Sequence, residues 1–298
     1  VAYVIGPKIG NGFLQNLRGN FDPLTMDRWW MRFVNRITGK PFVEFSDSLI
    51  EKNRDRLWDS ISNYENFNDI EKGMLEDAIT ELNAALANRG FYLIVDKGTV
   101  VKSPIEVLFF NSTKNSFSQY RNKILVGENS EIKIVEKIID LSNSNTLVNC
   151  FTQINCRKNS QVEFNKIQNN VKTSKLIDSV NIFQEQDSTC EVNTLIFGGG
   201  FVRNNLNFQQ NGTNCESNMN GVSLLDEKQF ADNHTFVDHK QANCRSNEMY
   251  KGIYLGQSKG VFNGKIMVRK DAQKIDAFQA NNNLLLSDGA TIDSKPQL

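Results

Sequence analysis

The chain has 298 residues, of which 39% are hydrophobic and 23% are charged, so its composition fits a folded globular protein rather than a disordered one. Lysine plus arginine and aspartate plus glutamate number 34 each, and this balance gives no overall positive field that would attract nucleic acid. No apolar run reaches the roughly 18–20 residues of a membrane-spanning helix, so no membrane contact is expected.

The five cysteines are odd in number and lie far apart in the sequence, which argues against a framework of disulfides. This usage is typical of a reducing compartment, and we therefore expect a cytoplasmic protein. The cysteines are Cys150, Cys156, Cys190, Cys215 and Cys244.

Helical periodicity dominates residues 1–88. Thr25 is a suitable cap for a helix that ends before Gly39, and further helices are expected from Ser48 and Asn68. The pattern changes to that of strands after residue 88. We therefore predict a small α-helical region over 1–88 and a mainly β domain over 89–298.

A basic stripe follows the first of these helices, because Arg28, Arg32 and Arg36 are spaced by four residues and Lys40 comes next. A solvated helix surface is the ordinary interpretation of such a stripe. Contact with nucleic acid phosphates is the alternative. The stretch also faintly resembles uncharacterised helical segments of phage-type proteins. A nucleic-acid-binding module fused to a passive β-solenoid is therefore the second hypothesis.

From Phe91 onward, short apolar runs alternate with corners rich in Gly, Asn and Asp, which is typical of strands. No helix-length pattern interrupts them, so a doubly wound α/β fold is excluded. Corners of the form polar–small–x–apolar recur about every 25–30 residues, the range of stacked repeats. We therefore expect a β-solenoid with one coil per repeat. The small corner residues are Ser130, Ser160, Ser188, Thr213 and Ala242.

Two stretches of the β half resemble the SufB/SufD family of iron–sulfur cluster assembly proteins. They are ELNAALANRGFYLIVDKGTVVKSPIEVLFF and NHTFVDHKQANCRSNEMYKGIYLGQSKGVFNGKIMVRKDAQKIDAFQANNNLLLSDGATIDSKPQL. With the coils between them, the resemblance covers about residues 81–298 and is closer to SufD than to SufB. It implies a right-handed parallel β-helix core and a non-catalytic scaffold subunit.

The same resemblance implies a cytosolic complex with a SufB-like subunit and a SufC-like ATPase. The complex, rather than this chain, would handle the iron–sulfur cluster and ATP. The first 80 or so residues do not match the family's own helical region, which suggests a foreign or mosaic segment. The family pattern continues beyond Leu298 with a segment that docks SufC, so we expect the chain to be truncated and to lack that docking surface.

Three cysteines and two histidines are the candidate metal ligands. Cys190, Cys215 and Cys244 are predicted to occupy the same corner position in successive repeats. Thiolates stacked in this way could hold a cluster or metal. Cysteine is also among the most buried residue types, and we prefer a core ladder as the interpretation. His234 and His239 are five residues apart on one strand and face opposite sides, so they cannot share one metal without a bulge.

No catalytic constellation stands out in the sequence. Gly198-Gly199-Gly200 lacks the Lys-Ser/Thr of a phosphate-binding loop and is expected to form a turn. The sequence therefore predicts no enzyme, no catalytic or cofactor-binding residue, and no metal ligand beyond the weak candidates above.

Overall fold

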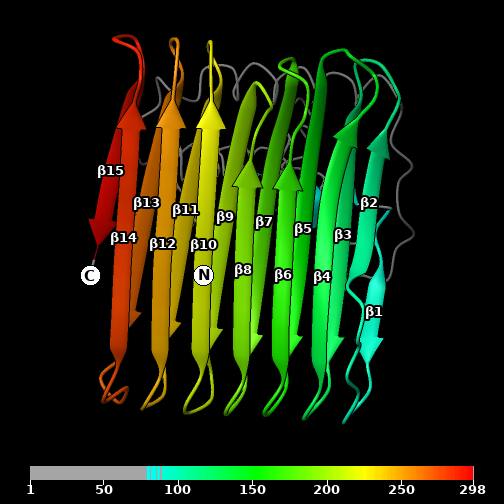
Figure 1. Ribbon diagram of the computed structural model, residues 1–298. Coiled ribbons are helices and arrows are strands. Elements are labelled where there is room, and N and C mark those ends of the chain that lie inside the picture. Colours follow the sequence, from blue (N-terminus) through cyan, green and yellow to red (C-terminus); the bar gives the residue numbers. More distant parts are fainter. Residues whose placement is uncertain (1–78, 81, 85, 88, 298) are drawn as a thin grey trace, which may run out of the picture. The chain divides into compact units, whose positions relative to one another are not determined.

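The computed structural model describes residues 79–80, 82–84, 86–87 and 89–297 (Figure 1). A boundary between two compact units falls between Ala87 and Asn88. Before that boundary, residues 79, 80, 82–84 and 86 are helical. The helices expected further upstream and the basic stripe of Arg28, Arg32, Arg36 and Lys40 lie outside the described residues.

Within the described part of the second unit, strands follow one another without an intervening helix. The strands are β1 Tyr92–Val95, β2 Ile105–Asn111, β3 Phe117–Val126, β4 Glu131–Asp140, β5 Thr146–Cys156, β6 Gln161–Gln168, β7 Ser174–Gln184, β8 Thr189–Ile196, β9 Phe201–Gln210, β10 Glu216–Leu225, β11 Phe230–His239, β12 Arg245–Tyr254, β13 Lys259–Val268, β14 Asp276–Leu285 and β15 Thr291–Gln297.

Consecutive strands alternate between two parallel sheets. The odd sheet has the order β1-β3-β5-β7-β9-β11-β13-β15, and the even sheet has the order β14-β12-β10-β8-β6-β4-β2. Each coil contributes one strand to each sheet, as Figure 1 shows. Register partners in neighbouring coils are 26 residues apart at Lys175 and Phe201 and 32 residues apart at Lys259 and Thr291. The predicted β-solenoid is therefore confirmed, and its longest repeats exceed the predicted 25–30 residues.

The corners that lead into the even sheet explain the abundance of asparagine. Asn129, Asn159, Asn214 and Asn243 have φ angles of 56°, 55°, 57° and 61°. Asparagine tolerates this left-handed conformation better than most residues. The side chains also join neighbouring coils, since Asn159 Nδ2 donates to Asn129 Oδ1 at 2.8 Å.

The glycine triplet between β8 and β9 is a turn, as predicted. Gly199 has a φ of 96°, where residues with a Cβ are strained. A Cβ on Gly200 would lie 2.1 Å from the carbonyl oxygen of Lys172, so the turn also depends on a close approach of two backbones.

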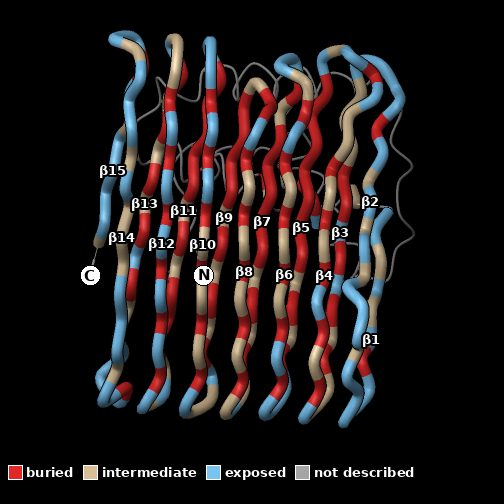
Figure 2. Tube along the Cα trace, viewed as in Figure 1, coloured by how far each residue is buried: buried red, intermediate tan, exposed pale blue. Residues whose placement is uncertain are grey.

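The apolar core fills the interior of the solenoid next to the corners that lead into the even sheet. It consists of side chains that alternate with outward-facing ones along the strands, as the burial pattern of β6 and β8 shows (Figure 2). Ile132, Phe164 and Ile182 are fully buried. Each such side chain stabilises the fold by about 1.5–3 kcal/mol relative to exposure.

The expected phase of the repeats is wrong in the later coils. Cys190 pairs in register with Ser217, and Ser217 pairs with Ser246. Cys215 directly precedes Glu216, and Cys244 directly precedes its register partner Arg245. The two cysteines therefore occupy the corner position that Ser188 occupies in its own coil. The three cysteines therefore lie on adjacent coils, but Cys190 is not equivalent to the other two.

The physical reason for this error is the position of the left-handed residue. The left-handed residue directly precedes the small corner residue. Since Asn214 and Asn243 are the left-handed residues, the small corner residues are Cys215 and Cys244 rather than Thr213 and Ala242. Ser130, Ser160 and Ser188 were assigned correctly.

Candidate functional site

A group of polar and ionisable side chains lies inside the solenoid, beside the apolar core. Glu136 lies on β4, Cys150 on β5, Lys166 on β6 and Asp178 on β7, and all four are buried. Strand alternation explains their position, because Glu136 continues the inward series of Ile132 and Ile134 and precedes Ile138. The group is therefore built into the pleat of the strands rather than into loops.

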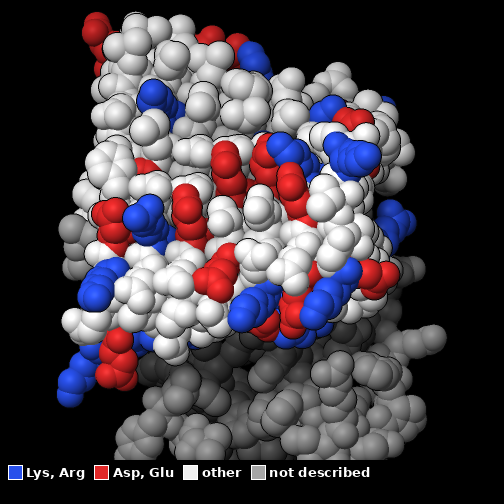
Figure 3. Space-filling view, turned by 60° about the horizontal axis from the view of Figure 1, so that its bottom comes forward, with Lys and Arg blue, Asp and Glu red and all other residues white. Residues whose placement is uncertain are grey.

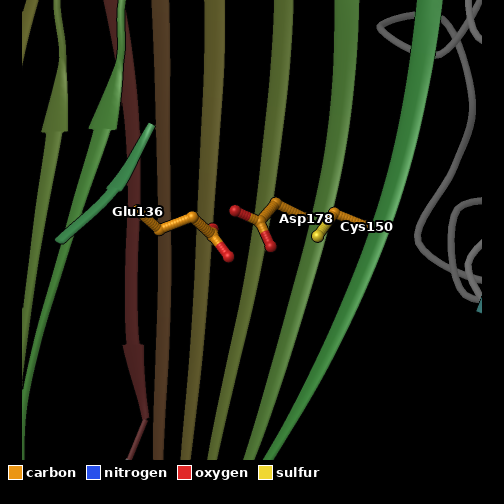
Figure 4. Close-up of side chains that lie close together, drawn as sticks. All are labelled: Glu136, Cys150 and Asp178. Carbon is orange, nitrogen blue, oxygen red and sulfur yellow. The ribbon is translucent and has the colours of Figure 1, made fainter. Parts of the chain in front are cut away.

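Three of these side chains converge. One ligand atom each from Glu136, Cys150 and Asp178 lies within 4.8 Å of the other two. Figure 4 shows the carboxyl groups of Glu136 and Asp178 pointing toward one another, with the Cys150 sulfur beside Asp178. Cys150 and Asp178 are register partners on neighbouring coils, whereas Glu136 reaches across from the even sheet.

The neighbours of this group hold Asp178 in one orientation. Lys166 Nζ lies 2.8 Å from Asp178 Oδ2, and Gln168 Nε2 donates to the same oxygen at 3.1 Å. Asp178 Oδ1 and Glu136 Oε2 are buried and have no hydrogen-bond partner among the described residues. At Cys150, the side-chain amide Nδ2 of Asn122 donates a hydrogen bond to Sγ at 3.5 Å.

Burial controls the protonation of the group. Burial and the carboxylate of Asp178 raise the pKa of Glu136 to about 8, while Lys166 acts in the opposite direction. Burial, followed by the charges of Glu136 and Asp178, raises the pKa of the Cys150 thiol well above its ordinary value. Burial therefore favours the neutral forms of the Glu136 carboxyl group and the Cys150 thiol, which lie beside the ion pair of Lys166 and Asp178.

Such a group is expensive in a protein core. Removing a charge pair from water costs several kcal/mol per ion before the attraction between the charges is regained, and apolar residues of similar volume are often as stable. The neighbouring inward positions of the same strands carry Ile, Leu and Val. Buried ionisable groups with perturbed pKa values cluster at functional sites, so this group is the candidate site.

The cysteines singled out from the sequence are placed elsewhere. Cys215 Sγ donates to the carbonyl oxygen of Gly212 at 3.1 Å, and Cys244 Sγ donates to the same oxygen at 3.3 Å. Cys190 is buried in the apolar core. The hydrogen bond with the neighbouring Cys156, followed by burial, raises the pKa of the Cys190 thiol well above its ordinary value. The sulfurs of Cys215 and Cys244 therefore lie at the corner turns, and that of Cys190 lies in the apolar core.

The two histidines lie on β11 and face opposite sides of the odd sheet. His239 is buried, and its Nε2 is 3.0 Å from Ser246 Oγ. His234 is partly exposed, and its Nε2 is 3.0 Å from Asp232 Oδ1. Within the residues that the structure describes, Glu136, Cys150 and Asp178 are the one set that brings three potential metal ligands of this kind together.

Glu136, Cys150 and Asp178 were not among the site residues predicted from the sequence. A signal was present, because Glu136 and Asp178 occupy inward phases of strands whose other inward residues are mostly apolar. Their convergence could not be predicted from the sequence, since it depends on how β4, β5 and β7 are placed relative to one another.

Figure 3 shows that acidic and basic side chains are interspersed along the corner edge between the odd and even sheets. Several are paired across coils, including Lys97 with Glu128 at 2.5 Å and Arg269 with Asp238 at 2.7 Å. Mixed charges give no single-sign surface for nucleic acid on this edge. Among the described residues, no helix has the length and hydropathy needed to traverse a bilayer.

Comparison with known proteins places these features in context. The family model described as "SUF system FeS cluster assembly, SufBD core domain" matches residues 109–298. The chain is 26% identical over 247 residues to the iron-sulfur cluster assembly protein SufD of Escherichia coli, and the match covers 80% of this chain and 58% of that protein.

Two further relatives show the same range of similarity. An iron-sulfur cluster assembly SufBD family protein of Synechocystis is 26% identical over 232 residues, which cover 74% of this chain and 51% of the relative. Protein ABCI7, chloroplastic, of Arabidopsis thaliana is 27% identical over 233 residues, which cover 74% and 49% respectively. The chain thus spans about half the length of the relatives that it matches.

Proposed function

The chain belongs to the SufBD family of iron–sulfur cluster assembly proteins, and from this premise we propose that it is a SufD-like scaffold subunit of a cluster assembly complex. The observation that carries the proposal is the family match over residues 109–298, which coincides with most of the β-solenoid. A stack of parallel coils, each hydrogen-bonded to the next, provides an extended and rigid surface on which partner subunits can assemble.

We propose that the chain has no catalytic activity of its own. The thiols of Cys150 and Cys190 are buried and have raised pKa values, so they are poor nucleophiles. ATP hydrolysis and the assembled cluster would then be handled by the complex, with a SufB-like subunit and a SufC-like ATPase as partners.

A cytoplasmic location is part of the same proposal. It is supported by the five free cysteines, all of which are buried and unpaired by disulfides. The competing hypothesis of a nucleic-acid-binding module rests on Arg28, Arg32, Arg36 and Lys40. None of the comparisons favours it.

The test is reconstitution of the complex. The purified chain is mixed with a SufB-like subunit and a SufC-like ATPase, and the mixture is analysed by size-exclusion chromatography with light scattering. We expect the chain to elute with the SufB-like subunit. A full-length SufD run in parallel is the positive control. If that control binds and this chain elutes alone, the scaffold proposal fails. A fluorescence-anisotropy titration with duplex DNA tests the competing hypothesis separately.

A further inference from the structure

We infer that Glu136, Cys150 and Asp178 form a binding site for one divalent transition-metal ion inside the solenoid. The inference concerns the isolated chain and does not depend on a partner. The identification of the physiological ion as Fe²⁺, carried as cargo, rests on the proposed function.

The distances among the three side chains suit one ion. Their ligand atoms lie within 4.8 Å of one another. In a tetrahedral site with metal–oxygen bonds of about 2.0 Å and one metal–sulfur bond of about 2.3 Å, the ligand atoms are about 3.3–3.5 Å apart. The ligand atoms would therefore have to approach one another by at most about 1.5 Å when the ion binds. The three ligands come from β4, β5 and β7, so the backbone that carries them is fixed by sheet hydrogen bonds on neighbouring coils.

Unpartnered oxygens give an independent indication of a ligand. Glu136 Oε2 and Asp178 Oδ1 are both buried, and neither has a partner among the described residues. Glu136 is 2% exposed and Asp178 is 0% exposed, so bulk water does not reach them. A buried acceptor without a partner is rare in folded proteins. A cation bound between the two carboxylates would satisfy both oxygens.

The surrounding residues resemble a second layer around a metal centre. Lys166 and Gln168 both hold Asp178 Oδ2, which leaves Oδ1 directed at the other ligands. The amide of Asn122 donates toward Cys150 Sγ and would stabilise its thiolate form. Such outer contacts fix the orientation of metal ligands and tune their basicity.

Charge balance limits the class of ion. With Glu136, Cys150 and Asp178 all ionised, three negative charges face the single positive charge of Lys166, and a divalent ion makes the loaded site neutral. Mg²⁺ and Ca²⁺ prefer oxygen ligands only, whereas one thiolate with two carboxylates suits Fe²⁺, Co²⁺ or Zn²⁺. Binding would release one proton from the Cys150 thiol and one from the Glu136 carboxyl group.

The experiment uses Co²⁺ and Fe²⁺ alone, added without oxygen to the purified full chain. We expect one equivalent to bind in equilibrium dialysis, and Co²⁺ to give a thiolate charge-transfer absorption. Cys150→Ser should abolish that absorption, and Glu136→Gln and Asp178→Asn should each weaken binding at least tenfold. Cys190→Ser is the matched control, since it replaces a buried thiol outside the group and should leave binding unchanged.

Two results would overturn the inference. One is a wild-type chain that binds neither ion stoichiometrically, and the other is a Cys150→Ser variant that binds as the wild type does. If that variant does not fold, X-ray absorption of the Co²⁺-loaded wild type decides the question, because one sulfur must be found among the ligands. Failure of reconstitution with the SufB-like subunit would affect the proposed function but not this result.

Discussion

Replacing Lys166 by methionine tests whether the interior group behaves as a buried charge network. The Lys166 side chain is 3% exposed, its partner Asp178 is 0% exposed, and the two charges are 2.8 Å apart. Removing one partner of such a pair leaves an uncompensated buried charge, which typically costs about 3–5 kcal/mol. We expect the free energy of unfolding at pH 7, measured by urea denaturation, to fall by about that amount.

The matched control is Lys133→Met, because Lys133 lies on β4, the neighbour of the Lys166 strand β6 in the even sheet. Lys133 Nζ lies 3.0 Å from Glu163, but the side chains are 47% and 33% exposed, so water already screens this pair. We expect little change in this variant. Combining Lys166→Met with Asp178→Asn should recover most of the lost stability, because neither partner of this pair then leaves an unpaired buried charge. Equal losses in the two single variants would show that the interior pair is solvated, and the reasoning would be wrong.

Three further predictions follow from local geometry. Since an ion displaces protons from Glu136 and Cys150, Co²⁺ affinity in dialysis should rise up to about 100-fold per pH unit below pH 8, and a pH-independent affinity would contradict this. Cys215→Ser should cost less than about 1 kcal/mol in urea denaturation, because the nearby carbonyl oxygens can accept from the new hydroxyl as they do from the thiol; a larger loss would show that these bonds cannot form. Asn159→Ala should lower stability by about 1–2 kcal/mol, because its φ is 55°, while Asn159→Gly should be nearly neutral, and equal losses would count against backbone strain.

The sequence was sufficient to predict the architecture of the β half. Apolar runs without helical interruption exclude βαβ units, and corners at a nearly constant spacing indicate stacked coils. The phase of those corners was harder to assign. The turns before Cys215 and Cys244 are one residue longer than the turn before Ser188, counted from the register partners Gln184, Gln210 and His239. Only the left-handed asparagine marks the true corner.

The candidate site illustrates a different limit. Glu136 and Asp178 break the apolar phase of their strands, and each is recognisable by itself as an unusual core residue. Their contact with Cys150 depends on which residues face each other across the interior. That arrangement is set by the register of the coils and by the width of the solenoid, and neither is encoded in a local pattern.

Nearest-neighbour stacking also determines how the solenoid opens. In backbone pairing, every strand of the described region is hydrogen-bonded only to the strands two places before and after it, so each coil stacks on its nearest neighbours. In such quasi-one-dimensional structures, unfolding spreads coil by coil from an end. The group of Glu136, Cys150 and Asp178 lies on β4, β5 and β7, which have neighbours on both sides in their sheets. Amide hydrogen exchange on these strands should therefore be slower than on β14 and β15, and the site should persist while the outer coils fray.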